Sequence, residues 1–105
     1  MLDEDVERAI RDEYESDGYL LPAYDDFCFA RVPGTVGRLL DADVGPALPD
    51  AVVEDVETDV DVVVLALVDG YGFAQWRRDH DSIPFLDRLT RTGRVTPLTS
   101  VYPSE

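Results

Sequence analysis

Residues 62–72 read VVVLALVDGYG, and the fold prediction starts from this stretch. Its seven consecutive apolar residues are too few to cross a bilayer, which takes about 18–20. The run lacks the alternation of a strand with one face in water. Its valines and the glycine that follows favour a strand buried on both faces. Strands of that kind belong to parallel sheets, so the stretch predicts an α/β fold.

Asp69 lies at the carboxyl end of this predicted strand, where open α/β sheets bind their ligands. Two interpretations follow. The carboxylate can be a metal ligand, with Gly70 and Gly72 letting the backbone turn sharply. It can instead cap the next helix by accepting hydrogen bonds from free backbone N–H groups. The stretch by itself leaves both interpretations open.

Charge and composition narrow the partners and the setting. The chain has 105 residues, enough for one small domain, and its 9 basic and 23 acidic residues give a net charge of −14. All the basic residues are arginine. This balance argues against nucleic acid and against an anionic membrane as partners. It is typical of a salt-filled cytoplasm, such as that of a halophilic archaeon, where salt screens self-repulsion. The acidic N-terminus does not resemble a signal peptide, so we expect a cytoplasmic protein.

Residues 1–60 predict an N-terminal extension in front of the strand. The spacing predicts a helix over residues 3–15, which Asp3 caps and Asp17-Gly18 ends. Residues 19–32, which are rich in aromatic side chains, predict a loop with a short strand near residues 27–31. Further expectations are a helix that begins at Pro33-Gly34-Thr35, a loop over residues 41–50, an acidic linker over residues 51–61, and a packed, unreactive thiol at Cys28.

After Asp69 the pattern predicts helices over residues 71–79 and 83–92, the second with Pro84 in its first turn and Gly93 as its stop. Residues 94–102, RVTPLTSVY, predict another strand. The order strand, helices, strand indicates a βαβ unit, with a right-handed crossover and parallel strands.

Three other constellations around the strand are weak. Gly70-Tyr71-Gly72 lacks the third glycine of a dinucleotide fingerprint, because Gln75 occupies that position. Asp79-His80-Asp81 resembles a metal-binding tripeptide, but His80 is the only histidine and we expect it to be solvated. We expect Arg77 and Arg78 to form surface ion pairs and not a phosphate site.

Three motifs follow one another from residue 61 onward. VVVLALVDG is an apolar strand ending in Asp-Gly, IPFLDRL with Gly93 fits the form "tPfLdrLa..G", and TPLTSVYPS fits the form "Pt.vyPs.T". In this order and spacing they resemble the opening of the type I phosphodiesterase/nucleotide pyrophosphatase family, in the alkaline phosphatase superfamily. The resemblance covers somewhat under half of the chain and implies that its βαβ unit is the first of an alkaline-phosphatase-like parallel sheet.

The resemblance implies roles for particular positions. Asp69 matches the family's first metal-binding aspartate. The family's Thr or Ser nucleophile stands two places after the residue that Ser104 matches, one place past Glu105. Ser104 matches only a flanking position and is the weaker candidate for the nucleophile. The other ligands, Asp and His, lie further along in the family. The resemblance implies two divalent ions, Zn²⁺ or Mn²⁺, and a small phosphate-ester substrate in the complete protein.

We therefore expect residues 1–60 to form an extension and residues 61–105 to begin a truncated catalytic domain of a metal-dependent phosphoester hydrolase. The chain alone should be inactive, because it lacks the expected nucleophile and most metal ligands. Two alternatives remain. The chain can be a non-catalytic acidic α/β module that binds a protein partner through residues 19–32, or a truncated gene product with no function of its own.

Composition yields a first prediction. Thermal melts at KCl concentrations from about 0.1 M to about 1 M should show a rising Tm, because the Debye length falls from about 10 Å to about 3 Å over that range. Screening then weakens repulsion within a compact chain of charge −14. A Tm that stays flat or falls with added salt would contradict the halophilic interpretation.

Overall fold

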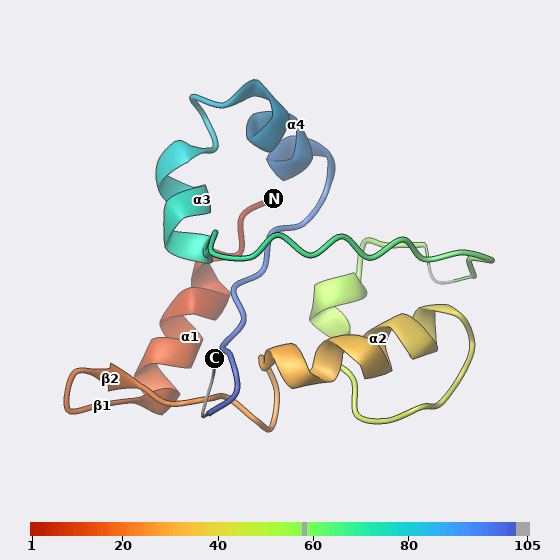
Figure 1. The fold of residues 1–105 in the computed structure, drawn as a ribbon, viewed down its shortest axis with the longest axis horizontal. Coiled ribbons are helices and arrows are strands. Elements are labelled where there is room, and N and C mark those ends of the chain that lie inside the picture. The colour runs from red at the N-terminus through yellow and green to blue at the C-terminus, as the bar shows by residue number, and fades with distance from the viewer. Residues whose placement is uncertain (58, 103–105) are drawn as a thin grey trace.

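The structure is a computed structural model that describes residues 1–57 and 59–102. It combines helices with one small antiparallel sheet of two strands (Figure 1). In chain order the elements are α1 (Glu4–Tyr14), β1 (Glu15–Ser16), β2 (Tyr19–Leu20), the 3₁₀ helix η1 (Phe29–Arg31), α2 (Val32–Leu39), the 3₁₀ helix η2 (Asp50–Val53), α3 (Phe73–Asp79) and α4 (Pro84–Thr92). The α-helices confirm the helices predicted from sequence, with bounds shifted by a few residues. Among the described residues, no helix has the length and apolar run that crossing a bilayer takes.

The first helix leads directly into the hairpin. Its first turn is acidic and Arg11 lies in its last turn, so both ends complement the helix dipole, and Ile10 is buried. Asp17 and Gly18 then connect β1 to β2, both with positive φ, of 52° and 80°. Two positive φ angles are what a type I′ hairpin turn requires. From the sequence, Asp17-Gly18 was predicted only to end the helix, and the hairpin was not predicted.

Helix α2 is shaped for a close approach by the loop that follows it. A Cβ atom at Gly34 would lie 2.0 Å from the backbone oxygen of Pro46, so only glycine fits at that position. The Thr35 hydroxyl donates to the Arg31 carbonyl at 2.8 Å and accepts the Leu48 N–H at 2.9 Å. Ala47 and Leu48 are buried in consequence.

Residues 94–99 connect the C-terminal part of the chain to the N-terminal part. Val95 forms a parallel bridge with Leu2, and Thr99 forms one with Cys28, where η1 begins. The Thr99 hydroxyl adds a bond from the Ala23 N–H at 2.8 Å. The predicted strand over residues 94–102 is therefore reduced to two isolated bridges, and its partners lie in the N-terminal extension. The short strand predicted near residues 27–31 is likewise a single bridge, at Cys28.

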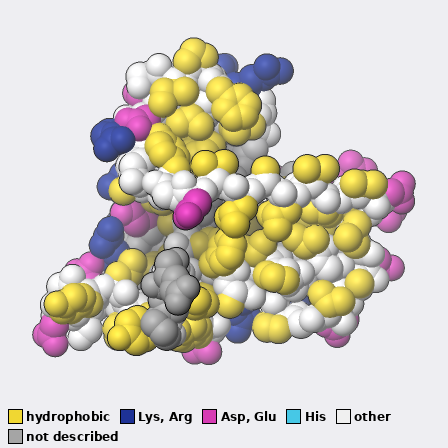
Figure 2. Space-filling model, in the orientation of Figure 1, with side chains coloured by type: hydrophobic (Ala, Val, Ile, Leu, Met, Phe, Trp, Pro, Cys, Tyr) yellow, Lys and Arg dark blue, Asp and Glu magenta, His cyan; other side chains and the backbone are white. Residues whose placement is uncertain are grey.

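Residues 62–68 differ most from the prediction. The structure assigns no strand to them, and they run as drawn-out chain across the molecule (Figure 1). Val64 is 87% exposed and Leu67 75% exposed. Hydrophobic side chains face the surface along this line (Figure 2). A strand exists only through hydrogen bonds to a neighbouring strand, and no described segment supplies them here. The parallel sheet expected from the sequence is absent from the described residues for this reason.

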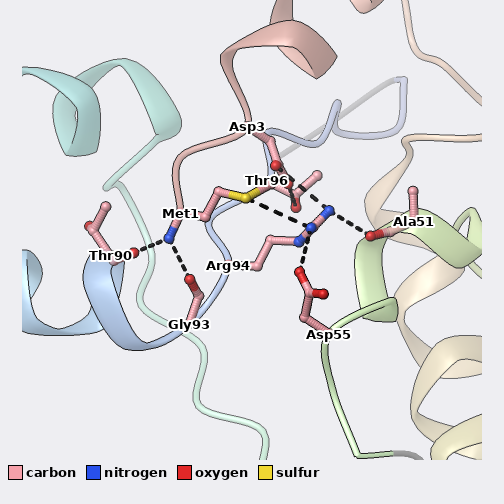
Figure 3. Close-up of polar contacts among 8 residues, drawn as sticks. All are labelled: Met1, Asp3, Ala51, Asp55, Thr90, Gly93, Arg94 and Thr96. Atoms are coloured by element: carbon pink, nitrogen blue, oxygen red, sulfur yellow. Dashed lines mark hydrogen bonds and ion pairs between the residues drawn. The ribbon is translucent and has the colours of Figure 1, made fainter.

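A polar cluster supports the connection between the two parts of the chain (Figure 3). Arg94, whose side chain is only 14% exposed, lies 3.7 Å from the buried carboxylate of Asp3. Arg94 also donates to the Asp55 carboxylate at 2.8 Å and to the Ala51 carbonyl at 2.6 Å. The Thr96 hydroxyl donates to the second oxygen of Asp3. The buried hydrophobic residues in the described part of the chain are few and mostly small. We therefore expect this cluster to contribute a larger share of the folding free energy than it would in a domain with a larger core.

The cluster yields a second prediction. Arg94→Ala should lower the free energy of unfolding by about 3 kcal/mol, because it leaves the Asp3 carboxylate buried without its cation. Arg91→Ala is the matched control, since Arg91 is 72% exposed and, among the described residues, forms its one ion pair with Asp87, one helical turn away. That change should cost about 0.5 kcal/mol or less. Urea unfolding in concentrated KCl measures both, and equal losses would contradict a special role for Arg94.

Candidate metal site at Asp69

Asp69 lies in an exposed turn between the apolar run and α3. Gly70, the next residue, has φ of +78°, and no atom would contact a Cβ there. Glycine is therefore favoured at this position by its backbone conformation and not by lack of space. The turn leaves the Asp69 carboxylate in solvent at the end of the run.

Helix α3 does not use Asp69 as its cap. Its N-cap residue is Gly72, and the Gln75 side chain accepts the Gly72 N–H at 2.9 Å. The Asp69 carboxylate makes no hydrogen bond or ion pair with another described residue. The structure therefore does not contain the helix cap, the second of the two interpretations of Asp69. Its carboxylate is accessible to solvent and free of other described partners, as a metal ligand would need to be.

The described residues supply one ligand and not a complete metal site. No group of three or more His, Cys, Asp or Glu side chains in residues 1–57 and 59–102 is placed to hold an ion. A single carboxylate suits Zn²⁺ or Mn²⁺ as one donor among several. A metal centre at Asp69 would need its remaining ligands from elsewhere. Ser104, the weaker candidate for the nucleophile, lies outside the described residues.

The tripeptide Asp79-His80-Asp81 has a structural role at the end of α3. The Asp79 carboxylate accepts the Arg78 guanidinium at 2.6 and 2.8 Å and the Tyr71 hydroxyl at 2.8 Å. These bonds, the one from Arg78 first, lower the Asp79 pKa to about 2. The His80 backbone N–H closes the helix on Trp76, and its ring is half-buried, with Nδ1 bonded to no described residue. We expected a solvated histidine, and the structure instead has a half-buried ring.

The arginine pair behaves as surface ion pairs, as the sequence predicted. Arg78 pairs with Asp79, and Arg77 pairs with Glu7 of α1. The Glu7 carboxylate also accepts Arg11 at 3.3 Å, so these arginines are engaged by carboxylates. The pair between Arg77 and Glu7 ties α3 to α1, a contact that the sequence did not predict.

The aromatic stretch of residues 19–32 is partly packed and partly exposed. Cys28 is fully buried, as predicted. Tyr24 and Tyr102 exchange hydrogen bonds between the Tyr24 hydroxyl and the Tyr102 backbone, at 2.8 and 3.2 Å. Large side chains of the stretch that face solvent include Tyr24 itself and Tyr19, Leu20, Leu21 and Phe29.

Comparison of the chain with family models, with curated proteins and with solved structures gave no match. The likeness to the phosphodiesterase family therefore stays a prediction from the three sequence motifs.

The Asp79 contacts yield a third prediction. Because the Asp79 pKa in the folded chain lies below its ordinary value of 3.8, the ionised form favours folding. That stabilisation is present above pH 3.8 and is lost as the pH falls toward about 2. Arg78→Gln should raise the Asp79 pKa, measured by NMR titration of its carboxyl carbon, and Tyr71→Phe should raise it less. Arg77→Gln is the matched control and should leave it unchanged. Equal shifts in the Arg77 and Arg78 variants would show a general charge effect instead.

Proposed function

We propose that this chain is the N-terminal part of a metal-dependent phosphoester hydrolase in which Asp69 is one metal ligand. The observation that carries the proposal is the exposed, uncommitted carboxylate of Asp69 at the end of an apolar run that itself lies in solvent. Seven apolar residues need cover, and a carboxylate at the carboxyl end of a covered strand is a common position for a ligand.

Charge supports a role for metal ions in such a protein. A chain of net charge −14 repels a phosphate ester. Bound divalent cations reverse the local sign of the potential and neutralise the charge on the phosphoryl oxygens. An anionic ligand such as Asp69 is suited to hold such a cation. Within the described residues Asp69 is a ligand donor only, and the nucleophile would lie elsewhere.

The exposed side chains of residues 19–29 favour a second candidate function, binding of a protein partner. Tyr19 is 74% exposed, and Leu21, Tyr24 and Phe29 are each about half exposed. Aromatic side chains of this kind are enriched at protein interfaces. In this alternative Asp69 has no chemical role.

The fourth prediction tests the hydrolase directly. The gene should continue past codon 105 with Thr or Ser at the next position and with Asp and His further on. In that longer protein, Asp69→Asn should lower kcat/KM for a chromogenic phosphodiester at least about 100-fold with Mn²⁺ or Zn²⁺ present. Replacing a residue that only hydrogen-bonds to a metal ligand already costs about 10- to 100-fold in metal affinity or activity. The 105-residue chain, assayed alone, should show no turnover.

Asp61→Asn is the matched control, because Asp61 is an exposed aspartate at the other end of the same apolar run. It should leave kcat/KM within about twofold of the wild type, since it removes the same charge without removing a ligand. A reading frame that closes at Glu105, or equal activity in the two variants, would refute the hydrolase. If Tyr24→Ala abolished binding of a protein partner, and Asp69→Asn changed neither that binding nor the hydrolytic activity, the second candidate would be favoured.

A further inference from the structure

The N-terminus of the described chain lies at the C-terminal end of α4 (Figure 3). The Met1 ammonium group donates hydrogen bonds to the Thr90 carbonyl and, at 2.5 Å, to the Gly93 carbonyl. The Met1 carbonyl accepts the Val95 N–H at 2.7 Å. Met1 is therefore bonded through both its nitrogen and its oxygen to the last turn of α4 and the segment that follows it.

Helix α4 needs donors at this end. The last carbonyls of an α-helix have no partner within the helix, and a glycine in the left-handed conformation is the usual way to satisfy them. Gly93 is extended instead, with φ of −132° and ψ of −163°, and its N–H bonds the Leu89 carbonyl at 2.8 Å. The ammonium group of Met1 bonds the next carbonyl, that of Thr90, and its positive charge complements the negative end of the helix dipole. The Met1 ammonium group thus acts as a C-terminal cap of α4.

The Met1 nitrogen is also the one primary amine in the sequence. All nine basic residues are arginine, whose guanidinium groups stay protonated and offer no lone pair to an acylating reagent. Met1 is 53% exposed and lies, with Gly93 and Arg94, in the wall of a hollow of about 280 Å³, so a reagent can approach it. In the cap, however, the nitrogen is an ammonium group whose N–H groups are engaged by carbonyls. Capping and acylation are therefore competing uses of the same nitrogen.

We propose that the Met1 α-amino group is a modification site, and that its acylation by an acyl thioester detaches residues 1–3 from the end of α4. An acylated nitrogen is uncharged and keeps a single N–H, so it cannot donate to two carbonyls or complement the helix dipole. The Leu2–Val95 bridge and the buried Asp3 carboxylate follow Met1 directly and would lose their anchor. Such a switch needs a chain that begins at Met1, and it does not depend on the proposed hydrolase.

The acylation step balances as an ordinary acyl transfer. The ammonium group first releases one proton to solvent, which frees the lone pair of the amine. That lone pair attacks the carbonyl carbon of the thioester, so a C–N bond forms and the C–S bond breaks. The nitrogen passes a second proton to the leaving thiolate, and the products are an amide at Met1 and a free thiol. Release of Met1 from the Thr90 and Gly93 carbonyls must come first, since the engaged ammonium group has no free lone pair.

Thermal melts of chains that differ only at this nitrogen test the proposal. Because the chain has no lysine, an acetyl N-hydroxysuccinimide ester applied to the denatured chain labels Met1 alone, and the product is refolded in concentrated KCl. The acetylated chain should melt at least about 5 °C below the unmodified chain. Reductive dimethylation supplies the matched form, which keeps the positive charge and one N–H and should melt above the acetylated chain. Arg91→Ala, which removes a charge from the last turn of α4 and leaves the amine unmodified, should lower the Tm by less than half as much.

Amide hydrogen exchange, measured by NMR, shows whether the loss is local. The Asp3 and Val95 amides belong to the segment that acetylation should detach, since the Asp3 N–H donates to the Val95 carbonyl at 2.9 Å. Their exchange rates should rise at least about tenfold more than those of the Phe29 and Thr99 amides, which lie at the other bridge.

The reactivity of the native chain gives a second measurement if the acetylated chain does not refold. The folded, unmodified chain should be acetylated at least about tenfold more slowly than the chain unfolded in urea at the same pH, because only a released amine can react. Equal rates would overturn the proposal. So would an acetylated chain with the Tm of the unmodified chain, a dimethylated chain that melts as low as the acetylated one, a Tm loss no larger than that of Arg91→Ala, or an equal rise in exchange at both bridges.

Discussion

The described structure depends on the pairing of residues 94–99 with two segments of the N-terminal part. Two parallel bridges, Leu2 with Val95 and Cys28 with Thr99, join the segment after α4 to the N-terminal part, and the buried carboxylate of Asp3 is held there by Arg94 and Thr96. Among residues 1–57 and 59–102, few other large hydrophobic side chains are buried. Backbone pairing and a partly buried ion pair therefore supply stability that a larger domain would obtain from apolar packing. The N-terminal extension is in this sense part of the same folded unit as the segment after α4.

Local patterns were sufficient for the helices and insufficient for the sheet. Helical periodicity, Pro84 near the start of α4 and Gly93 at its end act within a few residues, so sequence alone located them. Asp3 was correctly placed at the start of α1, but its side chain is bonded to Thr96, 93 positions further along, and does not cap the helix. A strand requires a distant partner, and the valines of residues 62–68 encode a tendency to be buried without naming that partner.

The same distinction between local and long-range interactions applies to the candidate site. The position of Asp69 at the end of an apolar run could be predicted from the sequence, as could the sharp turn with glycine at residue 70. That Asp69 does not cap α3 could not be predicted, because it depends on α3 beginning at Phe73 with the Gln75 side chain bonded to Gly72. The half-buried ring of His80 was missed because burial there arises from the packing of α3 and its surroundings, which no local pattern reports.

Acidity and the exposed apolar run place opposite demands on this chain. An apolar segment with free backbone groups promotes edge-to-edge association, and charged residues at its ends, here Asp61 and Asp69, are the usual protection. Salt screens that protection, and it also screens the repulsion between chains of charge −14. A salt-rich setting therefore strengthens any tendency of the run to find a partner.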